Sequence, residues 1–74
     1  MVNGNFSLKH ILGLKVRDLR MEQDLSFQAL SEQTGLSMSY LSEIEKGKKY
    51  PKGDKIIALS EAFCVSYDYL VSLQ

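Results

Sequence analysis

The chain reads SFQALSEQTGLSMSYLSEIEKG from Ser26 to Gly47, and this stretch decides its fold. Ser26 and Ser37 are N-cap residue types, whose hydroxyl accepts a hydrogen bond from a free amide in the first turn of a helix. Gly35 and Gly47 can adopt the left-handed conformation that ends a helix. We therefore predict two short helices joined by a tight corner at Gly35.

Apolar spacing predicts which sides of these two helices face inward. Leu30 faces the core from the first helix, and Leu36 closes the corner. Leu41 and Ile44 lie one turn apart on the second helix and define its buried side. The opposite arc is short and polar, and it consists of Met38, Ser39, Ser42, Glu43 and Lys46. A two-helix corner with such a ridge has the shape of a helix-turn-helix, whose second helix enters the DNA major groove.

Further residues occur in a fixed order along the chain. They are Leu30-Ser31, Gly35-Leu36-Ser37, Tyr40-Leu41-Ser42, Ile44-Glu45-Lys46-Gly47, Pro51 and Ala62-Phe63-Cys64-Val65-Ser66. Over roughly residues 8 to 73, the sequence resembles the phage Cro/repressor, or XRE-type, helix-turn-helix family. The resemblance implies an all-α, compact five-helix lambda-repressor-like DNA-binding domain. It also implies sequence-specific binding of double-stranded DNA by a transcriptional regulator, most simply a repressor.

Length and composition are those of one small soluble domain. Seventy-four residues have room for a single domain, so we assign residues 1–74 to it, with residues 1–6 as a loose arm. The chain also ends without a polar tail, as the N-terminal part of a longer protein would. No apolar run approaches the ~20 residues that span a bilayer, and we expect no membrane contact. Without a secretory signal, and with Cys64 as the single cysteine, the chain is expected to be cytoplasmic.

Charge is balanced over the whole chain but is not evenly spread. Nine basic side chains oppose nine acidic ones, yet residues 46–55 hold five lysines against Asp54 alone. This window therefore has a net charge of +4, and the rest of the chain has −4. Because the basic window follows the second helix of the corner, we expect a loop that lies on the DNA backbone, where lysines release counterions.

Three further helices complete the predicted fold. The first runs from about Leu8 to Gln23, and its inward face carries Leu8, Leu12, Val16 and Leu19. Its far face carries His10, Leu14, Arg17 and Met21. A later helix begins near Gly53 or Asp54 and buries Ile56, Leu59 and Phe63. The last follows Ser66 as its N-cap, with Asp68 placed to favour the helix dipole.

The predicted DNA contacts fall into two groups. Candidates for base edges are Ser37, Met38, Ser39, Ser42 and Glu43. Serine suits several bases, Met38 could touch a thymine methyl group, and Glu43 could accept a hydrogen bond from a cytosine amino group. Candidates for phosphate contacts are Arg20, Ser26, Gln28, Lys46, Lys48, Lys49 and Tyr50.

The family resemblance adds one interaction and two departures. Members commonly pair an arginine with a glutamate where this chain has Arg20 and Glu45, which implies an ion pair beside a phosphate. The family usually has glutamine at the position of Phe27. We therefore expect its phosphate contact to have moved to Gln28 or to be lost, with Phe27 as a packing residue. The family commonly has glycine where this chain has Cys64, which could change how the chain leaves that helix.

Apolar residues at the C-terminus suggest a partner. Tyr69, Val71 and Leu73 cannot all reach the core, and in the resembled family this region often forms a two-fold contact, which implies a homodimer, at least on DNA. An alternative is a protein-binding module such as an antitoxin or adaptor, which would use Leu14, Met21 and Val71. The lysine cluster favours DNA, because such a module does not need a net charge of +4 there.

No pattern in the sequence indicates catalysis. The chain offers Cys64 only one histidine, His10, as a base, and no ligand set with metal-binding spacing is present. A glycine-rich phosphate loop is also missing from the sequence. We therefore expect no enzyme activity, no cofactor, no metal and no small-molecule ligand.

Overall fold

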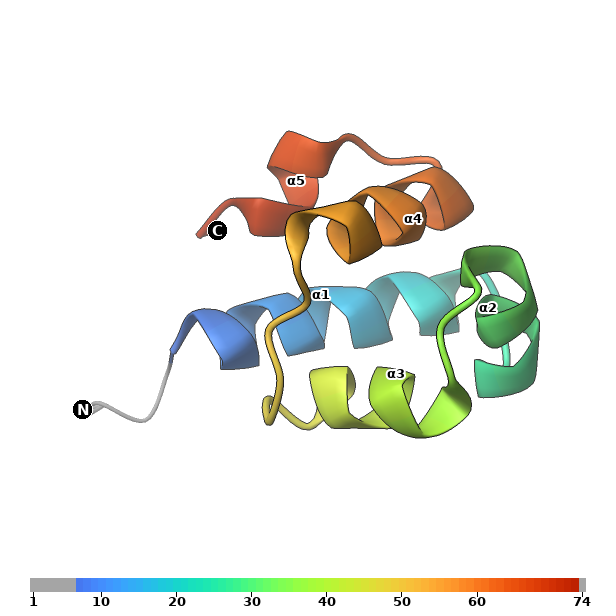
Figure 1. Cartoon of the computed structure of the whole chain (residues 1–74). Coiled ribbons are helices and arrows are strands. Elements are labelled where there is room, and N and C mark those ends of the chain that lie inside the picture. The colour runs from blue at the N-terminus through green and yellow to red at the C-terminus, as the bar shows by residue number, and fades with distance from the viewer. Residues whose placement is uncertain (1–6, 74) are drawn as a thin grey trace.

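The computed structural model describes residues 7–73, which form five α-helices and no strand (Figure 1). These helices are α1 (Leu8–Glu22), α2 (Phe27–Thr34), α3 (Met38–Glu45), α4 (Gly53–Phe63) and α5 (Tyr67–Val71). The predicted all-α, five-helix architecture is confirmed. The loose arm predicted for residues 1–6 lies outside the described residues.

Helix α1 is the central element of the fold. In Figure 1 it passes through the middle of the molecule, with α3 on one side and α4 and α5 on the other. It packs against α3 and α5, while α2 contacts both α3 and α4 at one end of the molecule. The corner formed by α2 and α3 is thereby fixed to the rest of the domain, and one long side of α3 remains at the surface.

One apolar core joins all five helices. Its buried members are Leu12, Val16, Leu19, Leu30, Leu41, Ile44, Ile56, Leu59, Phe63 and Leu70. The inward faces predicted for α2, α3 and α4 are confirmed. The prediction for Leu8 is wrong, since its side chain is 54% exposed. Leu8 is the first residue of α1 and lies one turn before Leu12, the first core residue of that helix, so the stripe extends beyond the core.

The helix ends follow the local signals in the sequence. Ser26, Ser37 and Ser66 each accept a hydrogen bond from the backbone N–H three residues later, at 3.0 to 3.1 Å. Gly35 ends α2 with a φ of 78°, and Gly47 has a φ of 77°. Both glycines therefore adopt the left-handed conformation predicted for them, and the corner between α2 and α3 is tight.

Cys64 ends α4 in the same way, although it is not a glycine. Its φ of 60° and ψ of 41° are left-handed, and the Val65 N–H donates to the Ser60 carbonyl at 3.0 Å. A left-handed residue with a side chain costs about 1–2 kcal/mol relative to the ordinary right-handed conformation. The exit from α4 thus keeps the left-handed turn without glycine.

Gly13 sets the distance between α1 and α3. A Cβ atom added there would overlap the Ile44 carbonyl oxygen and would lie 3.0 Å from the Glu45 carbonyl oxygen. Both atoms belong to the backbone of α3, so neither can move away by a side-chain rotation. Glycine therefore lets α1 approach the C-terminal turn of α3 directly, which positions the exposed side of α3.

No helix within residues 7–73 combines the length and apolar character needed to cross a membrane. The same residues also contain no group of three or more His, Cys, Asp or Glu side chains placed to hold a metal ion.

Candidate nucleic-acid interface

The surface of α3 presents the polar ridge expected from its sequence. Met38 is 51% exposed, and Ser39 and Lys46 are exposed as well. Ser42 and Glu43, which belong to the same ridge, are half-buried. Ser37 is exposed, but its oxygen already accepts the Tyr40 N–H at the start of the helix, so its O–H remains as the donor to a ligand.

An ion pair joins α1 to the last turn of α3. Arg20 Nε lies 2.6 Å from Glu45 Oε2, and a second Arg20 nitrogen lies 3.2 Å from Glu45 Oε1. Another Arg20 nitrogen donates to the Leu25 carbonyl oxygen at 3.0 Å. The hydrogen bond to the Glu45 carboxylate raises the pKa of Arg20 above its ordinary value, so the guanidinium stays charged. The side chains of Arg20 and Glu45 are only 17% and 8% exposed, and this ion pair therefore holds α1 against α3.

Phe27 completes the surroundings of this guanidinium. Its ring centroid lies 4.1 Å from the Arg20 Cζ atom, which is a cation–π contact. The ring also packs against the core from the first turn of α2. Phe27 is thus a packing residue, and Arg20, which belongs to α1, contacts both α2 and α3. Gln28, the next residue, is exposed.

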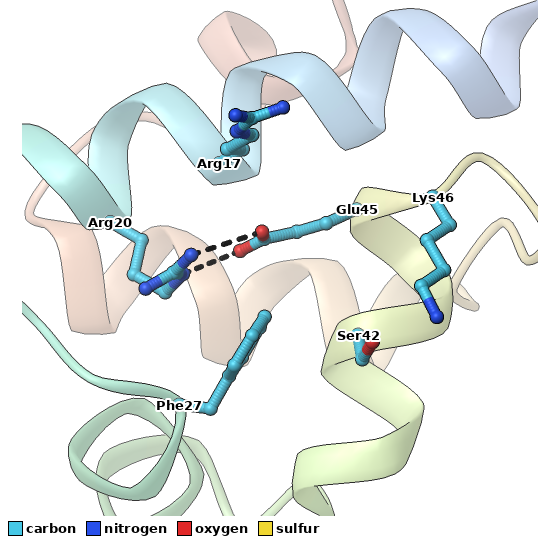
Figure 2. A pocket seen from close by; sticks show the side chains of 6 residues that line it. All are labelled: Arg17, Arg20, Phe27, Ser42, Glu45 and Lys46. Carbon is cyan, nitrogen blue, oxygen red and sulfur yellow. Dashed lines mark hydrogen bonds and ion pairs between the residues drawn. The ribbon is translucent and has the colours of Figure 1, made fainter.

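A polar pocket of about 300 Å³ opens beside the ion pair. Its lining residues come from α1, α2 and the end of α3, and they are Arg17, Arg20, Phe27, Ser42, Glu45 and Lys46 (Figure 2). Three of these residues are cations and one is an anion, whose carboxylate is already bound to Arg20. The pocket is therefore suited to an anionic group such as a phosphate.

The basic loop after α3 is anchored by a buried residue. Pro51 is almost fully buried, whereas Lys48 and Lys49 are exposed and Tyr50 is 38% exposed. Lys49 Nζ lies 3.4 Å from Glu43 Oε1 and 5.6 Å from the Tyr40 ring centroid. The structure therefore places one lysine of this loop against the side of α3 itself.

The N-terminus of α2 offers donors that point to solvent. Its first turn has no acidic residue, and the exposed Ser26 accepts the Ala29 N–H at 3.0 Å. The Ser26 O–H remains able to donate to an anion, beside the exposed amide of Gln28. This end of α2 lies next to the pocket, since Phe27 lines it.

Two residues near the interface were missed by the sequence reasoning. Arg17 was placed on the far face of α1, yet it lines the pocket. Its spacing of three residues from Arg20 was a signal that could have identified it. His10 was given no role. Its ring lies against Gly47, just after α3, and its Nδ1 is 2.9 Å from Ser7 Oγ.

The C-terminal segment is held by a lysine from α1. Lys15 Nζ donates to the carbonyl oxygens of Tyr69 at 2.8 Å and Ser72 at 2.7 Å, and to Ser72 Oγ at 2.6 Å. Tyr69 remains 50% exposed and Leu73 66% exposed, while Val71 is half-buried against the core. Of the three residues expected at a dimer contact, two therefore present apolar surface and Val71 lies at its edge.

A family model described as helix-turn-helix matches residues 16–70. The chain belongs to the helix-turn-helix family. The family resemblance read from the sequence is thereby confirmed, and α2 and α3 are the two helices of the motif.

Individual relatives agree with this assignment. The helix-turn-helix chain is 33% identical over 55 residues to the transcriptional regulator ClgR of Mycobacterium tuberculosis, covering 74% of this chain and 49% of ClgR. It thus spans about half the length of that relative. The P22 c2 repressor, in complex with synthetic operator 9T, superposes with a TM-score of 0.81 at 30% identity, covering 86% of this chain and 97% of the repressor.

A third relative comes from a restriction-modification system. The controller protein C.AhdI of Aeromonas hydrophila superposes with a TM-score of 0.82 at 26% identity. The match covers 88% of the helix-turn-helix chain and 98% of C.AhdI. The five-helix arrangement is thus shared over nearly the whole of the described structure.

Proposed function

We propose that this chain binds double-stranded DNA in a sequence-specific manner through α3 and regulates transcription. One observation carries the proposal: the exposed polar ridge of α3 has cations on both of its edges. Arg17, Arg20 and Lys46 surround the pocket on one edge, and Lys49 lies against the other. A polar helix between two cationic edges fits a major groove, which lies between two phosphate backbones.

The proposed contacts divide along the same geometry. The base edges are contacted by the N-cap Ser37 and by four residues of the ridge, Met38, Ser39, Ser42 and Glu43. Phosphates are contacted by Arg20, Ser26, Gln28, Lys46, Lys48, Lys49 and Tyr50. We add Arg17 to this second group, because it lines the pocket with Arg20 and Lys46.

The similar proteins support this proposal for the matched domain. They do not show what a longer protein containing this domain would do. The P22 c2 repressor forms a complex with a synthetic operator, and ClgR is a transcriptional regulator. Repression is the simplest mode for a small domain that occupies DNA. The proposed activity is binding without catalysis or a cofactor, and its proposed place is the cytoplasm.

We further propose that two copies bind together as a homodimer. Tyr69 and Leu73 present apolar surface at the C-terminus, with Val71 at its edge. A two-fold pair would place two α3 helices about 34–36 Å apart, one DNA turn. The preferred site would then be a palindrome with half-sites at that spacing.

Selection from randomised duplexes tests both proposals in one experiment. Wild type should select one sequence, and a dimer should select it as a palindrome. Ser39→Ala should then change the preference at one base pair per half-site by about 1–3 kcal/mol. Gln33→Ala, at an exposed position of α2 outside the proposed contacts, is the matched control and should select the wild-type sequence.

Two results would contradict the proposals. A wild-type protein that shows no sequence preference would leave a protein-binding module as the better account. A single half-site as the preferred sequence, bound by one copy, would remove the homodimer and leave the DNA-binding proposal in place.

A further inference from the structure

Two neighbouring lysines in the loop after α3 have different surroundings. Lys49 Nζ lies 3.4 Å from Glu43 Oε1, and its ammonium lies 5.6 Å from the Tyr40 ring centroid. Tyr40 and Glu43 are one turn apart on α3, so together they hold the lysine on the side of that helix. For the exposed side chain of Lys48, the structure of residues 7–73 records no ion pair or cation–π contact.

We propose that Lys49 is a positioning residue for sequence specificity, which holds the Glu43 carboxylate in place for a base edge. This inference rests on the proposed DNA binding through α3. It assigns Lys49 a role that Lys48 does not share, although both are exposed lysines of one loop. A carboxylate accepts a hydrogen bond from an amino group on a base edge, such as that of cytosine.

Electrostatics explain why Glu43 needs a cation beside it. DNA carries a dense negative charge, so a carboxylate that enters the groove without a partner is repelled by the phosphates. An ammonium 3.4 Å away offsets this repulsion. Lysine has three N–H donors, so Lys49 can keep Glu43 and still donate to a phosphate.

The ion pair is weak before DNA binds and stronger afterwards. In the free protein the side chains of Lys49 and Glu43 are 52% and 43% exposed, and water screens their attraction. Docked DNA removes much of this water, and the attraction between the two charges rises as the local dielectric falls. The contribution of Lys49 to specificity therefore appears in the complex and has little effect on the stability of the free domain.

The test compares single variants of the 74-residue chain on randomised duplexes. Glu43→Gln first identifies the base pair that residue 43 contacts, because it changes the preference there. Lys49→Ala should then reduce discrimination at that same base pair by about five- to tenfold. Lys48→Ala is the matched control, with the same loss of charge, and should weaken binding to every duplex by one common factor while the preferred sequence stays the same.

A double-mutant cycle separates positioning from simple loss of charge. In the Glu43→Gln background there is no carboxylate to hold, so Lys49→Ala should cost the same fold-change in affinity as Lys48→Ala. Lys49→Arg keeps the positive charge beside Glu43 and should retain the wild-type preference. Thermal melting should show that all variants remain folded, since both lysines are exposed.

The outcomes distinguish this inference from the proposed function. If Lys49→Ala and Lys48→Ala select the same sequence with wild-type discrimination, Lys49 is an ordinary phosphate contact and the inference is overturned, while DNA reading by α3 stands. A loss of discrimination with Lys49→Ala that persists in the Glu43→Gln background also overturns it. If wild type selects no sequence, the proposed function fails and the inference fails with it.

Discussion

Replacing Gly13 with alanine tests how the position of α3 is set. The added Cβ would overlap the Ile44 carbonyl oxygen and lie 3.0 Å from that of Glu45, where ordinary contact begins near 3.4 Å. Inserting one methyl group into such a contact costs about 1–3 kcal/mol, and alanine returns up to about 1 kcal/mol of helix propensity. We expect a net loss of about 1–2 kcal/mol, which lowers the melting temperature by roughly 4–16 °C.

Gly53→Ala is the matched control for this prediction. Gly53 begins α4, and the nearest atom to its added Cβ would be Tyr67 Oη at 3.8 Å, which is an ordinary contact. This substitution should therefore change the free energy of unfolding by less than about 0.5 kcal/mol. Differential scanning calorimetry of both variants measures the difference, and duplex binding should weaken only for Gly13→Ala because α3 moves. Equal or higher stability of Gly13→Ala would refute the claim that this glycine sets the distance between the helices.

Two further substitutions test the core and the ion pair. Leu41→Ala should lower the free energy of unfolding in urea by about 2–5 kcal/mol, because Leu41 is fully buried. A loss below about 1 kcal/mol would show that the inward side of α3 is misassigned. Glu45→Gln should cost about 1–3 kcal/mol, because it removes the charge from a mostly buried hydrogen-bonded pair. Glu22 is exposed, so Glu22→Gln should lower the free energy of unfolding by less than about 0.5 kcal/mol. Equal losses for Glu45→Gln and Glu22→Gln in urea would contradict the structural role of the Arg20–Glu45 pair.

The helix ends could be predicted because their causes are local. Serine caps and left-handed glycines act within a few residues, so the sequence located both ends of α2 and the start of α3. Helix α1 ends at Glu22, one residue before the predicted Gln23. The core faces followed from apolar periodicity for the same reason, since one helix determines its own buried side.

Contacts between distant parts of the chain could not be predicted in this way. Lys15 donates to the carbonyl oxygens of Tyr69 and Ser72 at the end of α5, which lie 54 and 57 positions further along the chain. No local pattern in the sequence indicates a contact over such a separation. Gly13 looks like a weak point within a helix until the distance to α3 is known. The error at Leu8 has the same origin, because periodicity defines a face but does not show where the neighbouring helices end.

Under the proposed DNA binding, the hydrogen bonds of the Arg20 guanidinium would restrict how a phosphate enters the pocket. Of its five N–H donors, two are bound by Glu45 and one by the Leu25 carbonyl oxygen, which leaves two. Phe27 covers one face of the group at 4.1 Å. A phosphate bound by the remaining donors would therefore have to approach in the plane of the guanidinium, from the pocket that Lys46 also lines. Arg20 is bound to Glu45, which belongs to α3, so a phosphate bound to Arg20 would fix the position of α3 relative to the DNA backbone. This phosphate contact would then help to determine which base pairs the ridge reaches.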